Sequence, residues 1–150
     1  MDERFGLDRG APAIASTAAV LDAPVEAVWA VLSDIEGWPS WNPDVKQARL
    51  EGPLASGTRF TWKAGPGTIR SVLQVVEPPR RIGWTGQTMG IRAAHVWEIE
   101  AADGGSRVRT EESWSGLIVS LMKPMMRGQL QKAMNSGLEH LEAEMKRRGA

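Results

Sequence analysis

Residues 116–148 read GLIVSLMKPMMRGQLQKAMNSGLEHLEAEMKRR, and this stretch decides the fold. Its apolar side chains recur every three or four residues, which is the spacing of one face of an amphipathic helix. That face comprises Ile118, Met122, Met125, Met126, Leu130, Ala133, Met134, Leu138, Leu141 and Met145. The stretch predicts one long C-terminal helix with a bend near Pro124. Its apolar face rotates gradually around the helix axis, which is the pattern expected for a helix packed against a curved sheet.

Composition excludes several classes of function. Eighteen basic residues balance eighteen acidic ones, so no net charge favours nucleic acid or an anionic membrane. The chain has no cysteine, and its two histidines, His95 and His140, are not at metal-ligand spacing. We therefore expect no metal and no cofactor. His140 lies among Glu139, Glu142 and Glu144 and is interpreted as a solvated surface residue.

The length of 150 residues is that of one domain. Residues 1–12 contain glycine, proline and charges and are expected to form a flexible tail, with the domain spanning residues 13–150. The tail lacks the apolar core of a secretory signal, and no apolar run in the chain reaches the roughly 18 residues that span a bilayer. These features predict a cytoplasmic protein without a membrane span.

The first part of the chain predicts a strand and two short helices. Residues 13–21 have small and β-branched side chains in partial alternation, as in a strand. Asp22 is a candidate helix cap, and Pro24 falls in the first turn of the helix that follows. Trp38 and Trp41 anchor the compact IEGWPSWNP segment at residues 35–43, expected to be a second helix or turn. The first helix is marked by apolar residues at helical spacing: Val25, Val28, Trp29 and Leu32.

The middle of the chain changes to a period of two. Strands are expected at residues 45–51, 58–64, 68–77, 80–87, 90–101 and 106–115. Asp103-Gly104 is a strong signal for a two-residue hairpin between the last two. Short strands joined by short turns predict an antiparallel meander, and helices on one face would bury that face.

This order of elements resembles the START-like, Bet v 1-type helix-grip (SRPBCC) superfamily, and more narrowly its polyketide cyclase/dehydrase and lipid transport branch. The resemblance covers about residues 13–147. It is carried by Ala23-Pro24, Val28-Trp29, Asp34, Trp38-Pro39, Trp41-Asn42-Pro43, Gly57-Thr58-Arg59-Phe60, Pro78-Pro79-Arg80 and Gly104-Gly105-Ser106-Arg107-Val108.

The resemblance implies an α+β helix-grip fold, in which a curved antiparallel sheet of about seven strands wraps the long helix and two short helices follow the first strand. It also implies an apolar cavity between sheet and helix. Members of the superfamily carry or transform sterols, polyketides, lipids, quinones and other hydrophobic ligands. Asp34, Trp38 and Trp41 are interpreted as structural, capping the first helices and packing at the cavity mouth.

Alternation of side chains predicts which residues face the helix. In the strand at residues 106–115, the face that contains Arg107, Glu111, Ser113 and Ser115 is expected to point away from the helix, into solvent. In residues 68–77 the set Ile69, Ser71, Leu73 and Val75 is favoured for the inner face. The remaining inner residues are expected to be Thr58, Phe60, Trp62, Ile82, Trp84, Ile91, Ala93, His95, Trp97, Ile99, Val108, Thr110, Glu112 and Trp114.

His95 and Glu112 are the titratable residues on this apolar face. Counting outward from the Asp103-Gly104 turn places His95 beside Glu112. A buried carboxyl group needs a raised pKa or a donor. The pair therefore has two interpretations: a His–Glu bridge in the core, or an acid–base and ligand-orienting pair in the cavity.

Two functions follow. The first is a module that binds a small hydrophobic lipid, polyketide or aromatic ligand; the second is a cyclase or dehydratase that uses His95 and Glu112 as catalytic residues. The two share one expected set of ligand-binding residues: Trp62, Trp84, Trp97, Thr110, Trp114, Met122, Met126 and Leu130.

Overall fold

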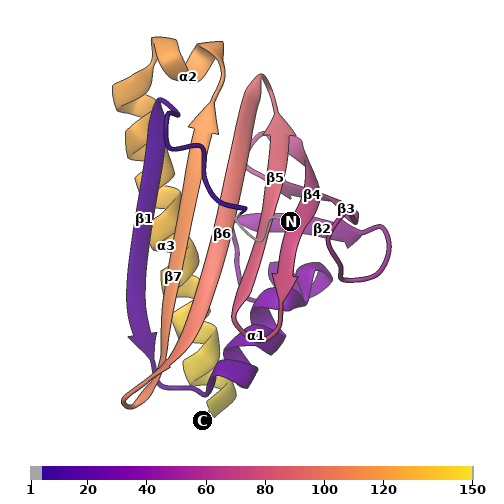
Figure 1. Ribbon diagram of the computed structural model, residues 1–150, viewed down its shortest axis with the longest axis vertical. Coiled ribbons are helices and arrows are strands. Elements are labelled where there is room, and N and C mark those ends of the chain that lie inside the picture. The colour runs from indigo at the N-terminus through magenta and orange to yellow at the C-terminus, as the bar shows by residue number, and fades with distance from the viewer. Residues whose placement is uncertain (1–4, 150) are drawn as a thin grey trace.

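The computed structural model describes residues 5–149. Within them, seven strands form one antiparallel sheet in the order β1-β7-β6-β5-β4-β3-β2. Figure 1 shows the curved sheet with α3 against its β1–β7 side and α1 near the C-terminal end of α3. Along the chain the elements are β1 (Ala13–Leu21), α1 (Val25–Ser33), the 3-10 helix η1 (Ile35–Ser40), β2 (Val45–Leu50), β3 (Arg59–Ala64), β4 (Gly67–Glu77), β5 (Arg81–Thr88), β6 (Ile91–Ala102), β7 (Gly105–Ser115), α2 (Leu117–Leu121) and α3 (Lys123–Gly149).

The predicted antiparallel meander is confirmed from β2 to β7, and β1 joins it by pairing with β7. The Asp103-Gly104 hairpin sets the β6–β7 register, with Ala102 paired to Gly105. His95 is consequently opposite Glu112, as the count from the turn predicted. The same register places Trp97 opposite Thr110 and Ile99 opposite Val108.

The two short helices are present, with Asp34 at the cap position between them as predicted, but Asp22 does not cap the first helix. Pro24 rather than Asp22 is the N-cap of α1, and the Pro24 carbonyl accepts from the N–H of Ala27 at 3.0 Å. Asp34 lies at the junction of α1 and η1, where its backbone carbonyl accepts from the Gly37 N–H at 3.0 Å. Main-chain groups close both turns because Pro24 and Asp34 already hold the backbone at the non-helical angles of cap positions.

The C-terminal helix is broken rather than bent. It consists of α2 and α3, separated at Met122, whose φ of −123° and ψ of 43° lie outside the helical region. Pro124 follows as the second residue of α3, where its missing N–H costs no helical hydrogen bond. In an unbroken helix Pro124 could not donate to the Ser120 carbonyl and its ring would clash with that carbonyl, so the break lies before the proline.

The strand β4 contains a bulge that changes which residues face inward. Leu73 pairs with Trp84, whereas Val76 pairs with Ile82, so the register shifts between them. Val75 instead pairs with Gly83 on the outer face. The inner placement of Leu73 is confirmed and that of Val75 is wrong, because the extra residue of a bulge reverses the alternation.

The N-terminal segment, residues 5–12, lies on the outer face of the sheet; residues 1–4 of the expected flexible tail are outside the described range. The Asp8 N–H donates to Ser113 Oγ at 3.3 Å, and Arg9 donates to both oxygens of Glu111 at 2.7 and 3.0 Å. Glu111 is 7% exposed and Ser113 2%. The expectation that these two residues face solvent is therefore wrong.

Side chains from the helices reach both edges of the sheet. On the β1 side, Arg127 Nε donates to the Pro12 carbonyl at 2.8 Å and Gln131 Nε2 donates to the Ser16 carbonyl at 3.0 Å. On the β2 side, the Leu50 N–H donates to a carboxylate oxygen of Glu36 at 2.9 Å.

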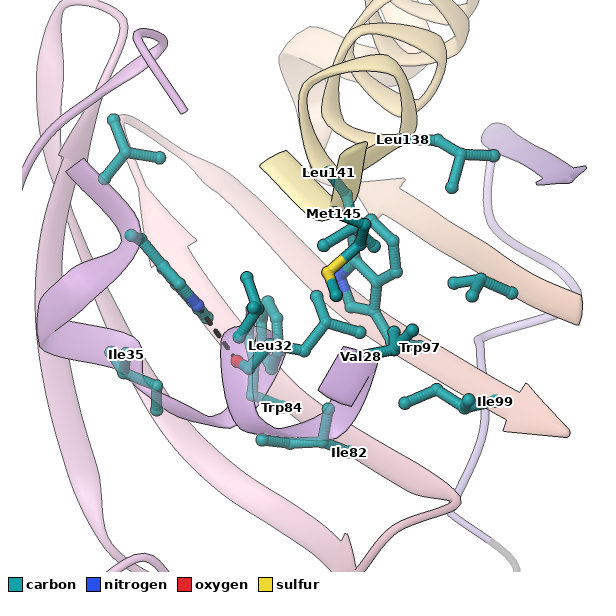
Figure 2. Packing of buried hydrophobic residues seen from close by; sticks show 14 of the residues in the cluster. Val28, Leu32, Ile35, Ile82, Trp84, Trp97, Ile99, Leu138, Leu141 and Met145 are labelled. Carbon is teal, nitrogen blue, oxygen red and sulfur yellow. Dashed lines mark hydrogen bonds between the residues drawn. The ribbon is translucent and has the colours of Figure 1, made fainter. Parts of the chain in front are cut away.

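The core has two clusters, one along each half of α3. Toward its end, Leu138, Leu141 and Met145 pack with α1 and the inner face of the sheet, as Figure 2 shows. In its first half, Met126, Leu130 and Met134 pack against the start of β1 and Val119 of α2. The second half of α3 therefore closes the core on the α1 side.

Candidate functional site

Two cavities lie between the inner face of the sheet and the helices. The outer cavity has a volume of about 690 Å³ and is lined by β3–β7, α2 and the first half of α3. The second cavity, of about 130 Å³ and here called the inner cavity, lies beside α1, η1 and the middle of α3. The two cavities share a boundary formed by Asp44, Trp62, Ala64, Trp84, Glu112 and Ala133.

The tryptophans expected in the site all line one or both cavities. Trp62 and Trp84 lie on the shared boundary, Trp97 lines the inner cavity, and Trp114 lines the outer one. Trp38, interpreted from the sequence as packing at the cavity mouth, instead lies at the inner cavity, with its ring centroid 5.4 Å from that of Trp62 and 5.2 Å from that of Trp84. Its Nε1 donates to the Leu32 carbonyl at 3.0 Å, which fixes η1 on α1.

Three other expected ligand-binding residues line neither of the two cavities in the described residues. Thr110 and Leu130 are fully buried behind the cavity walls. Met122 is 40% exposed because it occupies the break between α2 and α3 and so leaves the inward-facing helical stripe. Met126 does line the outer cavity, as expected.

The sequence analysis missed part of the outer cavity wall. Gln87, Thr88 and Met89 line it from the β5–β6 turn, whose backbone reverses at Met89 with a φ of 49°. Ala133 lines both cavities from α3. Its place seven residues after Met126, on the same helical face, was the signal that could have identified it.

His95 and Glu112 are brought together as expected. His95 Nδ1 lies 3.2 Å from Glu112 Oε1, yet among residues 5–149 this nitrogen has no partner with hydrogen-bond geometry. Its Nε2 is 2.8 Å from Thr110 Oγ1, and Thr110 Oγ1 donates to Met134 Sδ at 3.7 Å. The second carboxyl oxygen of Glu112 accepts from Trp114 Nε1 at 2.8 Å.

Burial sets the charge of this pair. It lowers the pKa of His95 to about 3 and raises the pKa of Glu112 to about 7, against the opposing hydrogen bond from Trp114. Both shifts favour the uncharged forms, because a charge loses hydration in an apolar interior. At neutral pH His95 is neutral, and Glu112 exchanges between the acid and the carboxylate.

His95 and Glu112 have different access to the cavities. The Glu112 side chain is 14% exposed and lines both, so its carboxyl group can touch a ligand. His95 lines the inner cavity, but its Nδ1 is covered and its Nε2 is used by Thr110. The arrangement gives one accessible proton-transfer group, Glu112, with His95 behind it. His140 lines neither cavity, but its part-exposed side chain places Nε2 3.9 Å from the carboxylate of Asp44, which lines both.

The sequence profile of a family described as polyketide cyclase / dehydrase and lipid transport matches residues 12–146. The chain belongs to this family. The match spans β1 to the last turn of α3, and so includes every element that lines the cavities of this polyketide cyclase / dehydrase family member. Comparison by sequence with curated proteins gives no match.

Solved structures share the fold of this family member at low sequence identity. A hypothetical protein from Helicobacter pylori has a TM-score of 0.81 and 18% identity over 96% of this chain and 98% of its own. A START superfamily protein from Mycobacterium smegmatis has a TM-score of 0.78 and 15% identity over 89% and 97%. The di-domain ARO/CYC BexL from the BE-7585A biosynthetic pathway has a TM-score of 0.73 and 17% identity over 87% of this chain and 48% of its own. These likenesses establish the START-like helix-grip fold.

Two further properties of residues 5–149 bear on the class of site. Their His, Asp and Glu side chains include no group of three arranged to hold a metal ion. None of the helices in this range is both long and apolar enough to cross a bilayer.

Proposed function

We propose that the chain binds a small hydrophobic ligand in the outer cavity, between the curved sheet and α3. The observation that carries the proposal is the cavity itself, about 690 Å³ in volume and walled by Trp62, Trp84 and Trp114 opposite Met126. Sites for small organic ligands are typically 300–1,000 Å³ and mostly apolar. The family description, which includes lipid transport, supports the same function.

Filling the cavity tests this proposal. Ala133 lines both cavities from α3, so Ala133→Trp would place an indole ring in the space that a ligand needs. Ala143→Trp, at an exposed position of the same helix, is the matched control. We expect 2-naphthol, followed by quenching of tryptophan fluorescence, to bind the native protein and the control equally and Ala133→Trp at least about tenfold more weakly. Equal binding to all three would overturn the proposal.

A co-purifying ligand would identify the natural class directly. Native mass spectrometry of the purified protein should show added mass that is lost in Ala133→Trp and retained in Ala143→Trp. Organic extraction of the same samples would then assign that mass to a lipid, a polyketide or another aromatic compound.

One observation supports a second function, that of a dehydratase or cyclase. Glu112 is the more buried of the two carboxyl groups at the boundary of the cavities, and burial raises its pKa to about 7. A group that titrates near neutrality serves as both base and acid. BexL, whose fold this chain shares, is an ARO/CYC from a biosynthetic pathway, and the chain corresponds to 48% of its length.

The proposed chemistry is the loss of water from a β-hydroxy ketone. The Glu112 carboxylate removes a proton from the carbon next to the carbonyl, and the C–H electron pair becomes the new C=C bond. The C–O bond on the neighbouring carbon breaks, and the hydroxide leaves as water with the proton from Glu112. His95 is neutral and covered, so it positions Glu112 rather than touching the substrate.

Turnover and binding must be measured separately to test this second function. With a naphthyl β-hydroxy ketone as substrate, we expect the native protein to form the conjugated enone, which is followed by ultraviolet absorbance. Glu112→Gln should lower turnover about 100-fold or more and keep substrate affinity within a few-fold. Unchanged turnover in Glu112→Gln would leave only the binding function.

A further inference from the structure

Glu112 is a largely buried carboxyl group in the wall of the proposed ligand cavity. Two carboxyl groups, Asp44 and Glu112, lie on the boundary between the cavities. The Asp44 side chain is 59% exposed and accepts a hydrogen bond from Ser136 at 2.7 Å. Glu112 is 14% exposed and surrounded by aromatic rings. A ligand in this space therefore meets one desolvated carboxyl group, and each of its hydrogen bonds there is strong.

The proton positions around Glu112 follow from its neighbours. Thr110 Oγ1 lies 2.8 Å from His95 Nε2 and 3.7 Å from Met134 Sδ, and His95 Nδ1 has no partner with hydrogen-bond geometry among residues 5–149. We assign the single Thr110 hydroxyl proton to the contact with Met134 Sδ, so that the Thr110 oxygen accepts from Nε2–H of His95. A neutral imidazole protonated at Nε2 has a bare lone pair at Nδ1. That lone pair lies 3.2 Å from Glu112 Oε1, where the proton of the neutral carboxylic acid can be held after a small rotation.

The carboxyl group therefore offers acceptors to the cavity. Its Oε2 already accepts from Trp114 Nε1 at 2.8 Å, and its own proton is directed away from the ligand, toward His95. The carboxylate form is likewise an acceptor. In both protonation states, a ligand satisfies Glu112 by donating a hydrogen bond.

We propose that the ligand carries a hydroxyl group, phenolic, enolic or alcoholic, that donates a hydrogen bond to the Glu112 carboxyl while His95 Nδ1 holds the carboxyl's own proton. This rests on the proposed ligand cavity and specifies the class of molecule that it takes. Anionic ligands are repelled whenever Glu112 is a carboxylate, and ketones without a hydroxyl group gain no hydrogen bond to Glu112.

Three probes with the same two-ring body separate these possibilities: naphthalene, 2-naphthol and 2-acetylnaphthalene. At pH 6 we expect the native protein to bind 2-naphthol about tenfold more tightly than naphthalene, as one hydrogen bond in an apolar site provides. The acceptor-only 2-acetylnaphthalene should bind no more tightly than naphthalene. Isothermal titration calorimetry measures all three.

Variants identify the group responsible. In Glu112→Leu the preference for 2-naphthol should disappear while naphthalene still binds. The control Glu100→Leu removes a carboxylate that is 69% exposed on the neighbouring strand, and it should keep the preference. In His95→Leu the Glu112 proton loses its acceptor and turns to the cavity, so binding of 2-acetylnaphthalene should tighten several-fold relative to naphthalene.

The outcomes separate this inference from the function on which it rests. Equal binding of naphthalene and 2-naphthol, or a preference that survives Glu112→Leu, overturns the hydroxyl assignment and leaves the ligand cavity standing. Failure of all three probes to bind the native protein overturns the cavity proposal, and the hydroxyl assignment with it. Unchanged ketone affinity in His95→Leu would remove the role of His95.

Discussion

Glu112 makes the stability of the fold depend on pH. Burial raises its pKa to about 7 from an ordinary value of 4.5, so the folded state binds its proton more tightly than the unfolded state does. The stability that comes from the neutral carboxyl group is fully present below pH 4.5 and is lost as the pH rises through 7. His95 has the opposite sign: its pKa is lowered to about 3 from 6.5, so stability is lost as the pH falls from 6.5 toward 3.

Glu112→Gln should remove the first of these dependences, because an amide cannot ionise. We expect the free energy of unfolding of the variant, relative to the native protein, to rise by ~2–3 kcal/mol between pH 4.5 and pH 8. Urea unfolding at several pH values measures this difference. Glu100→Gln, at an exposed carboxylate on the neighbouring strand β6, should show a flat difference. A flat difference for Glu112→Gln as well would mean that the carboxyl group stays hydrated.

The β6–β7 hairpin contains two adjacent glycines, Gly104 and Gly105, whose surroundings differ sharply. Gly104 has a φ of +82° with open space around it, whereas Gly105, with a φ of +148°, lies against β1. A Cβ atom at Gly105 would be 1.9 Å from the Leu21 carbonyl oxygen. The start of β7 can pass the end of β1 only because residue 105 has no side chain.

Alanine at these two adjacent positions should therefore have different effects. Gly104→Ala incurs the strain of a left-handed backbone, about 1–2 kcal/mol. Gly105→Ala adds a collision with main-chain atoms that cannot rotate away, and we expect a loss of at least ~3 kcal/mol. Thermal unfolding of both variants tests the difference. Equal losses of stability in the two variants would show that β1 and β7 can move apart to accommodate a Cβ atom at residue 105.

The sequence sufficed for elements in which local chemistry decides the geometry. The Asp-Gly turn sets its hairpin register, so the pairing of His95 with Glu112 could be read from residue spacing. The bulge in β4 could not be predicted from the sequence, because its extra residue, Gln74, is not a glycine or another residue type that marks a bulge. The prediction that Met122 lines the cavity was wrong for a related reason. The apolar residues keep helical spacing through Met122 in the sequence, but the helix itself is broken at that residue.

At the scale of the whole molecule, the outer face of the sheet is covered by a segment far away in sequence. Arg9 and Arg109 both donate to Glu111, at 2.7 and 3.1 Å, and these hydrogen bonds hold the pKa of that carboxyl group below its ordinary value although its burial acts to raise it. The alternation of side chains in β7 predicted that Glu111 and Ser113 face solvent. Residues 5–12 have no periodic pattern, so the sequence did not indicate that they cover this face.

Arg9→Ala should uncover this face. We expect the pKa of Glu111 to rise, because two charge-assisted hydrogen bonds to the carboxylate are lost, and we expect faster amide exchange at Asp8. Carboxyl chemical shifts in a pH titration and hydrogen–deuterium exchange measure the two effects. Arg107→Ala, which affects only an exposed contact with Glu100, should change neither. Unchanged exchange at Asp8 would mean that other contacts hold residues 5–12.

The side chains at the two edges of the sheet bear on self-association. An edge strand presents unpaired main-chain groups on which a second chain can add a strand, the first step toward aggregation. Along β1, Arg127 and Gln131 of α3 occupy carbonyls of this kind, and along β2 a carboxylate oxygen of Glu36 occupies the Leu50 N–H. These side chains occupy main-chain groups that an added strand would need, so they act against strand addition at both open edges of the sheet.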